Sequence, residues 1–157
     1  MAANGSKSKK RSGASSSSKP PKPLVFFLDR SLGRKKIAAA LRQAGAEVRV
    51  HDDLFPPNAK DEDWLPEVGR KGWVVFTKDR KIRYRASERA ALMRAGVRAF
   101  VLTAGDLQGV EMAQIFVKAL PAIFRFVARN SPPFIAKVAR SGAVTMLDRG
   151  HVRRPSK

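Results

Sequence analysis

Residues 24–28 read Leu-Val-Phe-Phe-Leu, and Asp29 follows them directly. This run is too short for a helix and holds no polar residue, which is typical of a strand that is buried on both faces. Strands of this kind lie in the middle of parallel sheets that helices cover on both sides. We therefore expect residues 24–28 to form a central strand, with Asp29 at its carboxyl end.

Helical and β-rich patterns alternate after this first run. The β-rich runs are short, and the helical patterns between them end near glycines that can supply a left-handed stop. This alternation predicts parallel strands joined by right-handed crossovers, hence a three-layer α/β fold whose central, mainly parallel sheet has about four strands flanked by helices. We expect the later strands at residues 48–50, 73–77 and 97–102, and the helices after Ser31, from Asp61 to about Gly69, and at residues 87–95.

Ser31 and Asp61 are residues of the kind that cap helix starts, and we expect each of them to cap the helix that follows it. Residues 51–60 contain a Pro-Pro-Asn sequence and are expected to form an irregular polar loop.

The last third of the chain has a different pattern. The apolar spacing over residues 106–129 predicts a long helix, with Pro121 as a kink. Residues 134–139 and 143–147 alternate around a Ser-Gly turn, which indicates a terminal hairpin. We expect one domain over residues 24–148, between basic tails.

The formal net charge is +19, from 32 basic and 13 acidic residues. Segments 1–23 and 149–157 hold ten of the basic residues and no acid, which leaves 22 basic and 13 acidic residues between them. Lys and Arg gain affinity for phosphates by releasing counterions, so this balance favours a nucleic-acid partner. The plainer alternative is that the charge only keeps the chain soluble. Segment 1–23 is expected to be disordered, either as an arm that holds nucleic acid or as an unstructured terminus.

The absence of cysteine excludes disulfides and thiolate metal sites, so any metal must be bound by oxygen or by His51 and His151. No apolar run approaches the roughly 20 residues that span a bilayer. The basic start is followed by Ser and Pro rather than by the apolar stretch of a secretory signal. We expect a cytoplasmic protein without membrane contact.

Three aspartates fall where the predicted sheet places a binding site. Asp29 follows the first strand, Asp79 comes just after the third, and Asp61 opens the helix that leads into that third strand. Ligands of open parallel sheets bind outside the carboxyl ends of the strands. Clustered carboxylates repel one another unless a cation is present, and Mg²⁺ and Mn²⁺ prefer oxygen ligands. We predict that Asp29, Asp61 and Asp79 bind Mg²⁺ or Mn²⁺, with Asp63 as an outer fourth carboxylate and Glu62 facing solvent.

Each aspartate also has an ordinary structural explanation. Asp61 can cap its helix and Asp79 can cap a turn. Asp29 can pair with Arg30 or Arg34. The metal-site hypothesis depends on the three aspartates together, since all of them fall at the same expected edge of the sheet.

Three segments carry a family resemblance. Phe-Leu-Asp-Arg-Ser-Leu at 27–32, Lys-Asp-Glu-Asp-Trp-Leu at 60–65 and Val-Val-Phe-Thr-Lys-Asp at 74–79 together resemble PIN-like domains, the nucleases that include VapC-type toxins. In the compact branch of that group, one Asp ends the first strand, a second begins an acidic helix, and a third follows a hydrophobic strand ending in Thr. The resemblance covers residues 24–102, and Arg30 departs from it, since related sequences often have an acid or a small polar residue there.

The resemblance implies a PIN-like fold and a metal-dependent ribonuclease that hydrolyses RNA phosphodiester bonds. It implies that Asp29, Asp61 and Asp79 are catalytic ligands of Mg²⁺ or Mn²⁺, and that Thr77 bonds to a carboxylate or to its water. A toxin of this type implies a cognate antitoxin protein as partner. A homodimer is a further expectation.

Basic side chains surround the acids and suit phosphate docking, although each could also belong to an ordinary solvated face. Tyr84 could stack on an unpaired base, whereas Trp64 and Trp73 are more simply core residues. The residues that we expect to bind RNA are Arg30, Arg34, Lys78, Arg80, Arg83 and Thr77.

Two other functions fit part of the pattern. A PIN-like fold can bind RNA or a protein partner without catalysis, and metal-dependent cleavage of RNA separates that function from a nuclease. A receiver-like domain would accept phosphate on Asp52 or Asp53. It also needs a lysine after its last parallel strand, and Leu-Thr-Ala-Gly at residues 102–105 offers none.

Overall fold

The structure is a computed structural model that describes residues 24–33, 35–56, 58–79 and 81–149. The tail predicted at residues 1–23 lies outside the described residues, and so does the tail predicted at 149–157 apart from Arg149. None of the helices in the described part combines the length and the apolar character that a membrane span needs.

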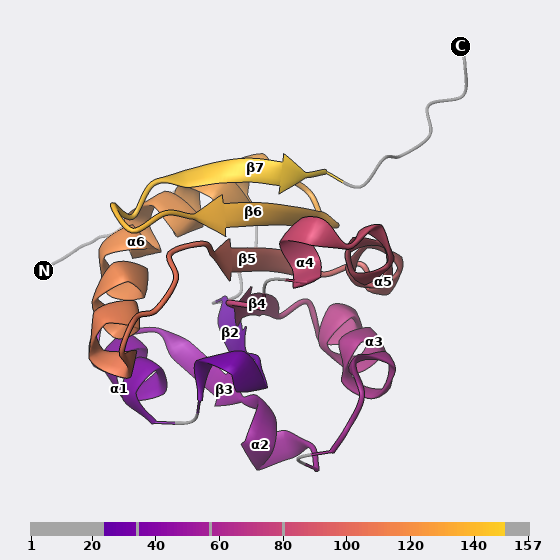
Figure 1. Ribbon diagram of the computed structural model, residues 1–157, viewed down its shortest axis with the longest axis horizontal. Coiled ribbons are helices and arrows are strands. Elements are labelled where there is room, and N and C mark those ends of the chain that lie inside the picture. The colour runs from indigo at the N-terminus through magenta and orange to yellow at the C-terminus, as the bar shows by residue number, and fades with distance from the viewer. Residues whose placement is uncertain (1–23, 34, 57, 80, 150–157) are drawn as a thin grey trace, which may run out of the picture.

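Strand β2 (Val25–Leu28) lies inside a six-stranded sheet, with β3 (Glu47–Val50) on one side and β4 (Val74–Thr77) on the other. Both neighbours pair with it in parallel. The last three residues of the strand are completely buried. The prediction of a strand inside the sheet is therefore confirmed for Val25–Leu28, although this strand is second in the order of six rather than at the centre (Figure 1).

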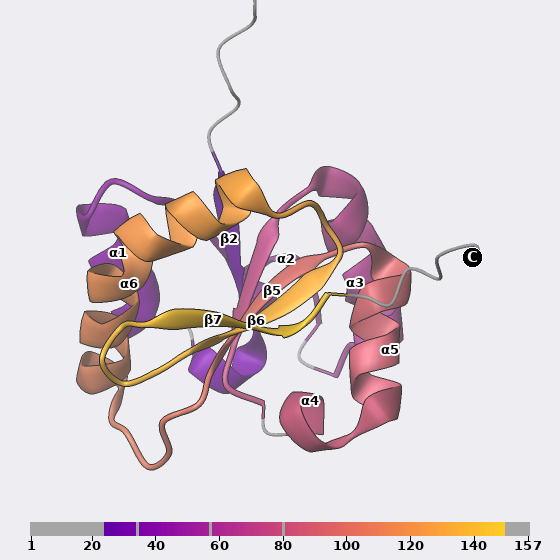
Figure 2. The ribbon, with the colours of Figure 1, turned by 90° about the horizontal axis from the view of Figure 1, so that it is seen from above.

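Two layers of helices cover the sheet, and the three-layer α/β prediction is confirmed (Figure 2). Helices α1 and α6 pack together on one face, and α3 and α5 pack together on the other. The helical elements are η1 (Arg30–Leu32), α1 (Lys36–Gln43), α2 (His51–Leu54), α3 (Asp61–Lys71), α4 (Lys81–Tyr84), α5 (Ala86–Ala95) and α6 (Gly109–Arg129).

Successive side chains of β2 enter different cores, because strand side chains alternate between the two faces of a sheet. Phe26 and Leu28 belong to the core under α1 and α6. Phe27 belongs to the core under α3 and α5, where its ring centroid lies 5.0 Å from that of Trp64. This double burial explains why the run contains no polar residue.

The predicted terminal hairpin is present as the antiparallel strands β6 (Phe134–Val138) and β7 (Val144–Asp148). Strand β6 also pairs in parallel with β5 (Arg98–Leu102), so the hairpin extends the main sheet. The strand order is β3-β2-β4-β5-β6-β7, and only the last pair is antiparallel. The 21-residue helix α6, which contains Pro121, is the crossover that a parallel connection requires. The sheet gains two strands over the predicted four or so because it includes this hairpin.

The helix starts differ from the predicted caps. Ser31 lies in the short turn η1, and α1 begins only at Lys36. Asp61 is the first residue of α3, and its N-cap is Lys60. The backbone N–H of Lys60 donates to the Asp63 carboxylate at 3.0 Å. The capping acid of α3 is therefore Asp63.

The predicted loop at residues 51–60 begins with one helical turn, α2 (His51–Leu54). His51 is completely buried and fixes this turn to the core. The turn ends at Leu54, and Phe55 is extended, because Pro56 disfavours helical backbone at the residue before it.

Helices α3 and α5 touch backbone to backbone at Gly69. A Cβ atom added there would collide with the carbonyl oxygen of Ala95. We expect Gly69→Ala to lower the free energy of unfolding by roughly 1–3 kcal/mol, because a backbone oxygen cannot move aside as a flexible side chain can. Urea denaturation of the purified chain measures this change.

Gly109→Ala is the matched control, because the added Cβ atom would meet the flexible side chain of Lys36. We expect this variant to be as stable as the parent or slightly more stable, since alanine favours helix over glycine. Equal stabilities of the two variants would contradict a close backbone contact at Gly69.

Candidate metal centre

Asp29, Asp61 and Asp79 come from three elements that meet at the carboxyl edge of the sheet. Asp29 follows β2, and its backbone N–H donates to the carbonyl oxygen of Phe76 on β4 at 3.0 Å. This bond aligns the end of β2 with the end of β4, just before Asp79. Asp61 opens α3 at the same edge, because a crossover helix runs antiparallel to the strands that it connects.

Two hydroxyl groups hold the Asp29 carboxylate. Thr77, which is only 1% exposed, donates from Oγ1 to Asp29 Oδ2 at 2.6 Å. Ser31 Oγ lies 3.2 Å from the same Asp29 oxygen and 3.2 Å from Thr77 Oγ1. Each hydroxyl also accepts a backbone N–H at 3.1 Å, from Lys78 at Ser31 and from Asp79 at Thr77. The predicted contact between Thr77 and a carboxylate is present, and it orients Asp29.

Asp79 turns the chain from β4 into α4. Its Oδ1 accepts the backbone N–H of Lys81 at 2.9 Å, and its carbonyl oxygen accepts the N–H of Ile82 at 3.2 Å. Asp79 therefore has the turn-capping role that the sequence left open. Within the described part of the chain, this arrangement leaves Asp79 Oδ2 for a further ligand.

Asp61 lies within electrostatic reach of three other carboxylates. Partial burial of its carboxyl group raises the pKa above the ordinary value of 3.8. The charges of Asp29, Glu88 and Asp79 raise this pKa further, and that of Lys81 lowers it. The acids at this edge therefore repel one another.

Glu88 is the member of this group that sequence reasoning missed. It lies in the first turn of α5, where an acid is an ordinary partner of the helix N-terminus. Its position matters because α5, like α3, begins at the carboxyl edge of the sheet. The usable signal in the sequence is its place at the start of the helix that follows Asp79.

The oxygen ligands of the four acids fit a hard divalent cation. Mg²⁺ and Mn²⁺ prefer carboxylates, and Asp29, Asp61, Asp79 and Glu88 supply them. In the part of the chain that the structure describes, no three such side chains are already arranged to hold a metal ion. Carboxylates without a cation keep apart, and two of these also bond to protein groups. Metal binding would therefore draw the acids closer together.

The other predicted site residues lie in different settings. Asp63 is exposed and caps α3, so its role as an outer ligand stays a prediction. Arg30 pairs with Asp52 at 3.7 Å, rather than with Asp29. Lys78 is half-buried, and Thr77 is too buried to meet RNA directly. Of the predicted RNA-binding residues, Arg34 and Arg80 lie outside the described residues, and so does the side chain of Arg83.

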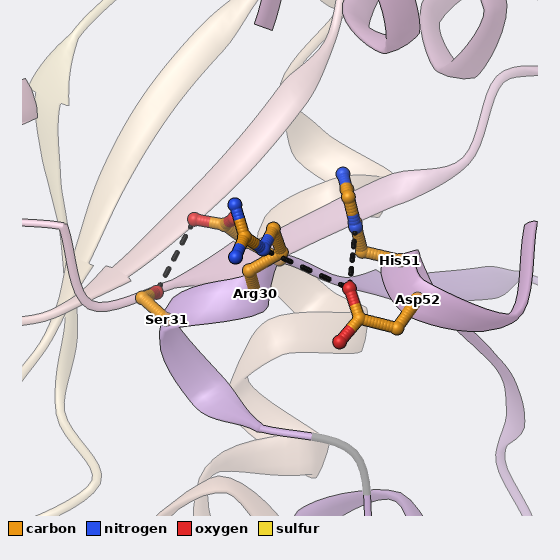
Figure 3. A network of polar contacts seen from close by, with 5 residues as sticks. Arg30, Ser31, His51 and Asp52 are labelled. Carbon is orange, nitrogen blue, oxygen red and sulfur yellow. Dashed lines mark hydrogen bonds and ion pairs between the residues drawn. The ribbon is translucent and has the colours of Figure 1, made fainter. Parts of the chain in front are cut away.

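A buried histidine, His51, lies beside the carboxyl edge of the sheet. Its Nδ1 is 2.9 Å from Asp52 Oδ1, and the same oxygen is 3.7 Å from Nε of Arg30 (Figure 3). The imidazole packs among three aromatic rings at centroid distances of 6.2, 5.7 and 5.6 Å, those of Phe27, Phe55 and Trp64 respectively. The sequence gives no signal for this row of contacts, because His51 and Arg30 belong to different segments.

The raised pKa of Asp61 predicts a pH-dependent stability without metal. The folded chain holds this proton more tightly than the unfolded chain, so the free energy of unfolding falls as pH rises from about 3.8 through the folded pKa. Asp61→Asn removes the ionised group, and we expect it to raise Tm at pH 7 by about 1–3 °C relative to Glu62→Gln. Thermal unfolding in EDTA measures this difference.

Glu62→Gln is the reference because it removes an exposed acid from the same first turn of α3, and with it the same attraction to the helix N-terminus. The advantage of Asp61→Asn should vanish at pH 3, where Asp61 is protonated in both states. A Tm no higher than that of Glu62→Gln at pH 7 would argue against carboxylate repulsion.

The hydroxyl of Thr77 gives a second test. Thr77→Val leaves the Asp29 carboxylate and the Asp79 N–H without this partner, and we expect a loss of about 1–3 kcal/mol of stability. Thr77→Ser keeps the hydroxyl and should lose only about 0.8 kcal/mol for the missing methyl group. Urea denaturation measures the stability of both variants. Equal losses would show that the Thr77 hydroxyl does not stabilise the fold.

Comparison with known proteins places these residues in a known context. A family model described as a PIN like domain matches residues 24–104. A Mycobacterium tuberculosis protein named "Putative ribonuclease VapC45" is 34% identical over 126 residues, which cover 78% of this chain and 91% of the relative. No solved structure matches the chain significantly. The segment matched by the family model contains all four acids of the candidate centre, Asp29, Asp61, Asp79 and Glu88.

Proposed function

This chain belongs to the PIN-like domain family, and on that basis we propose that it is a metal-dependent endoribonuclease that hydrolyses RNA phosphodiester bonds. The observation that carries the proposal is that Asp61 lies within electrostatic reach of Asp29, Asp79 and Glu88, which come from other segments at the same edge of the sheet. One of them, Asp29, is held in place by the buried Thr77. The name of the mycobacterial relative, which is that of a ribonuclease, supports the same activity.

The carboxylates have different parts in this proposal. Asp29 is the fixed ligand, because two hydroxyls orient it before any cation binds. Asp61 and Glu88 lie in the first turns of their helices and would be further ligands, whose mutual repulsion a cation would relieve. Asp79 contributes the carboxylate oxygen that its turn does not use. Asp63 is proposed to act from outside this group, through water.

A bound Mg²⁺ or Mn²⁺ supplies an activated water for in-line attack and neutralises charge on the scissile phosphate. The chain itself attracts and orients the RNA. Its net charge of +19 draws in a polyanion, and Arg30 and Lys78 flank the acids to contact phosphates. Arg34, Arg80 and Arg83 belong to the same basic segments and are proposed to contribute to this attraction.

We also propose that the chain is the toxin of a toxin–antitoxin pair. The resemblance to VapC-type toxins supports this role, and it gives the protein two partners, RNA and a cognate antitoxin protein. The cytoplasm is the proposed location, since both partners belong there. Dimerisation stays a prediction.

Cleavage of a single-stranded RNA tests the nuclease proposal. The purified chain should cut a fluorophore-quencher RNA with Mn²⁺ or Mg²⁺ and lose this activity in EDTA. Asp29→Asn and Asp79→Asn should lower the rate by about 100-fold or more, and Glu88→Gln by about 10–100-fold, because each removes a charged ligand. A fluorescence time course measures these rates.

Glu62→Gln is the matched control, because it removes an exposed acid next to Asp61 and should keep the parent rate. Thermal unfolding must show that each inactive variant is folded. A parent chain that binds RNA but cuts none with either ion would refute the nuclease and leave a non-catalytic RNA-binding module. An Asp29→Asn variant as active as the parent would show that the proposed metal centre does not carry the activity.

A further inference from the structure

We propose that His51 and Asp52 are positioning residues, which hold the Arg30 guanidinium beside the acidic group so that it binds a phosphate of the RNA. This inference rests on the proposed function, because it adds residues to the same site. Its basis is the row of contacts from imidazole to carboxylate to guanidinium (Figure 3).

Packing alone does not explain a histidine at position 51, because burying a polar side chain costs free energy. Its side chain is completely buried among aromatic rings, and its Nε2 has no hydrogen-bond partner among the described residues. A buried polar atom without a partner costs stability, and a phenylalanine or leucine would fill such a space without that cost. The polar group that the site uses is therefore Nδ1, which faces Asp52.

The contact at Nδ1 fixes the Asp52 carboxylate. An ionised carboxylate only accepts hydrogen bonds, so Nδ1 carries the proton and donates to Asp52 Oδ1 at 2.9 Å. The imidazole cannot swing away, because its ring is enclosed. Asp52, whose side chain is 26% exposed, is thereby held at the boundary between the core and the surface.

Asp52 in turn restrains Arg30. The Arg30 side chain is 51% exposed, and its Nε lies 3.7 Å from the same Asp52 oxygen. At this distance the contact is an ion pair rather than a hydrogen bond, so it orients the guanidinium by charge from its Nε side and keeps the other edge for a planar, two-point contact with a phosphate. Arg30 also directly follows Asp29, the acid that Thr77 orients. A long side chain that is ordered before RNA arrives loses less conformational entropy on binding.

For Asp52, the proposal predicts a change in RNA affinity opposite in sign to the change that the loss of a negative charge alone would cause. Removing one negative charge from a face that binds a polyanion should tighten RNA binding. Glu62→Gln, a change of equal charge at another exposed acid near the site, measures that general effect. Asp52→Asn should instead weaken RNA binding by about 3–10-fold, because Arg30 loses its restraint.

The experiment is a double-mutant cycle on the full chain. Fluorescence anisotropy with labelled single-stranded RNA in EDTA gives Kd, and cleavage with Mn²⁺ gives KM and kcat. Arg30→Gln should weaken binding by about tenfold and reduce the salt dependence of log Kd by about 0.7. In the Arg30→Gln background, Asp52→Asn should weaken binding no further. KM should follow Kd while kcat changes less than about twofold.

His51→Phe keeps the packing and removes the bond to Asp52, so it should weaken binding in the same direction as Asp52→Asn. Arg30→Lys should not restore the parent Kd, because lysine has no Nε edge for Asp52 to hold. Circular dichroism shows whether His51→Phe is folded. If it is not, the cycle of the two surface residues decides the question alone.

Two results would overturn the inference. One is an Asp52→Asn variant that tightens RNA binding as Glu62→Gln does, and the other is equal weakening with and without Arg30. A parent chain that cuts no RNA would refute the proposed nuclease instead. The binding cycle in EDTA needs no cleavage, so it would still confirm or refute the restraint of Arg30.

Discussion

The burial of β2 on both faces is the constraint on which the rest of the structure depends. Phe26 and Leu28 fill one core and Phe27 fills the other, so a shift of one residue would move every side chain to the wrong face. This register sets the point where the chain leaves the core. Asp29 stands at that point, and its backbone bond to Phe76 fixes it relative to β4. Packing thus determines where the site begins.

A site built from like charges needs support from its surroundings. Thr77 and Ser31 stabilise the Asp29 carboxylate through hydroxyls that backbone amides orient. Asp61 and Glu88 lie in the first turns of α3 and α5, where the helix N-terminus attracts negative charge. The pKa of Asp61 is nevertheless raised, first by burial of its carboxyl group and then by the charges of Asp29, Glu88 and Asp79. A bound cation would relieve the repulsion among these charges.

The sequence predicts the layers and three of the four acids, because short apolar runs and residues at strand ends are local signals. It fails where the partner is distant. Ser31 looks like a cap, but its hydroxyl lies against Thr77, 46 positions away. Strand β6 joins β5 only through the long crossover α6. Glu88 resembles any acid in a first helical turn until the fold places it beside Asp61.

The contact at Gly69 has a consequence for the choice of ion. Gly69 and Ala95 lie at the opposite ends of α3 and α5 from Asp61 and Glu88, roughly 12 Å away along a helix. The contact at that end fixes how closely the two helices approach each other, so it also influences the spacing of Asp61 and Glu88 near their other ends. Divalent ions differ in radius and in the oxygen spacing that they demand. The spacing of Asp61 and Glu88, set in part by this contact, would therefore bear on which divalent cation the proposed centre accepts.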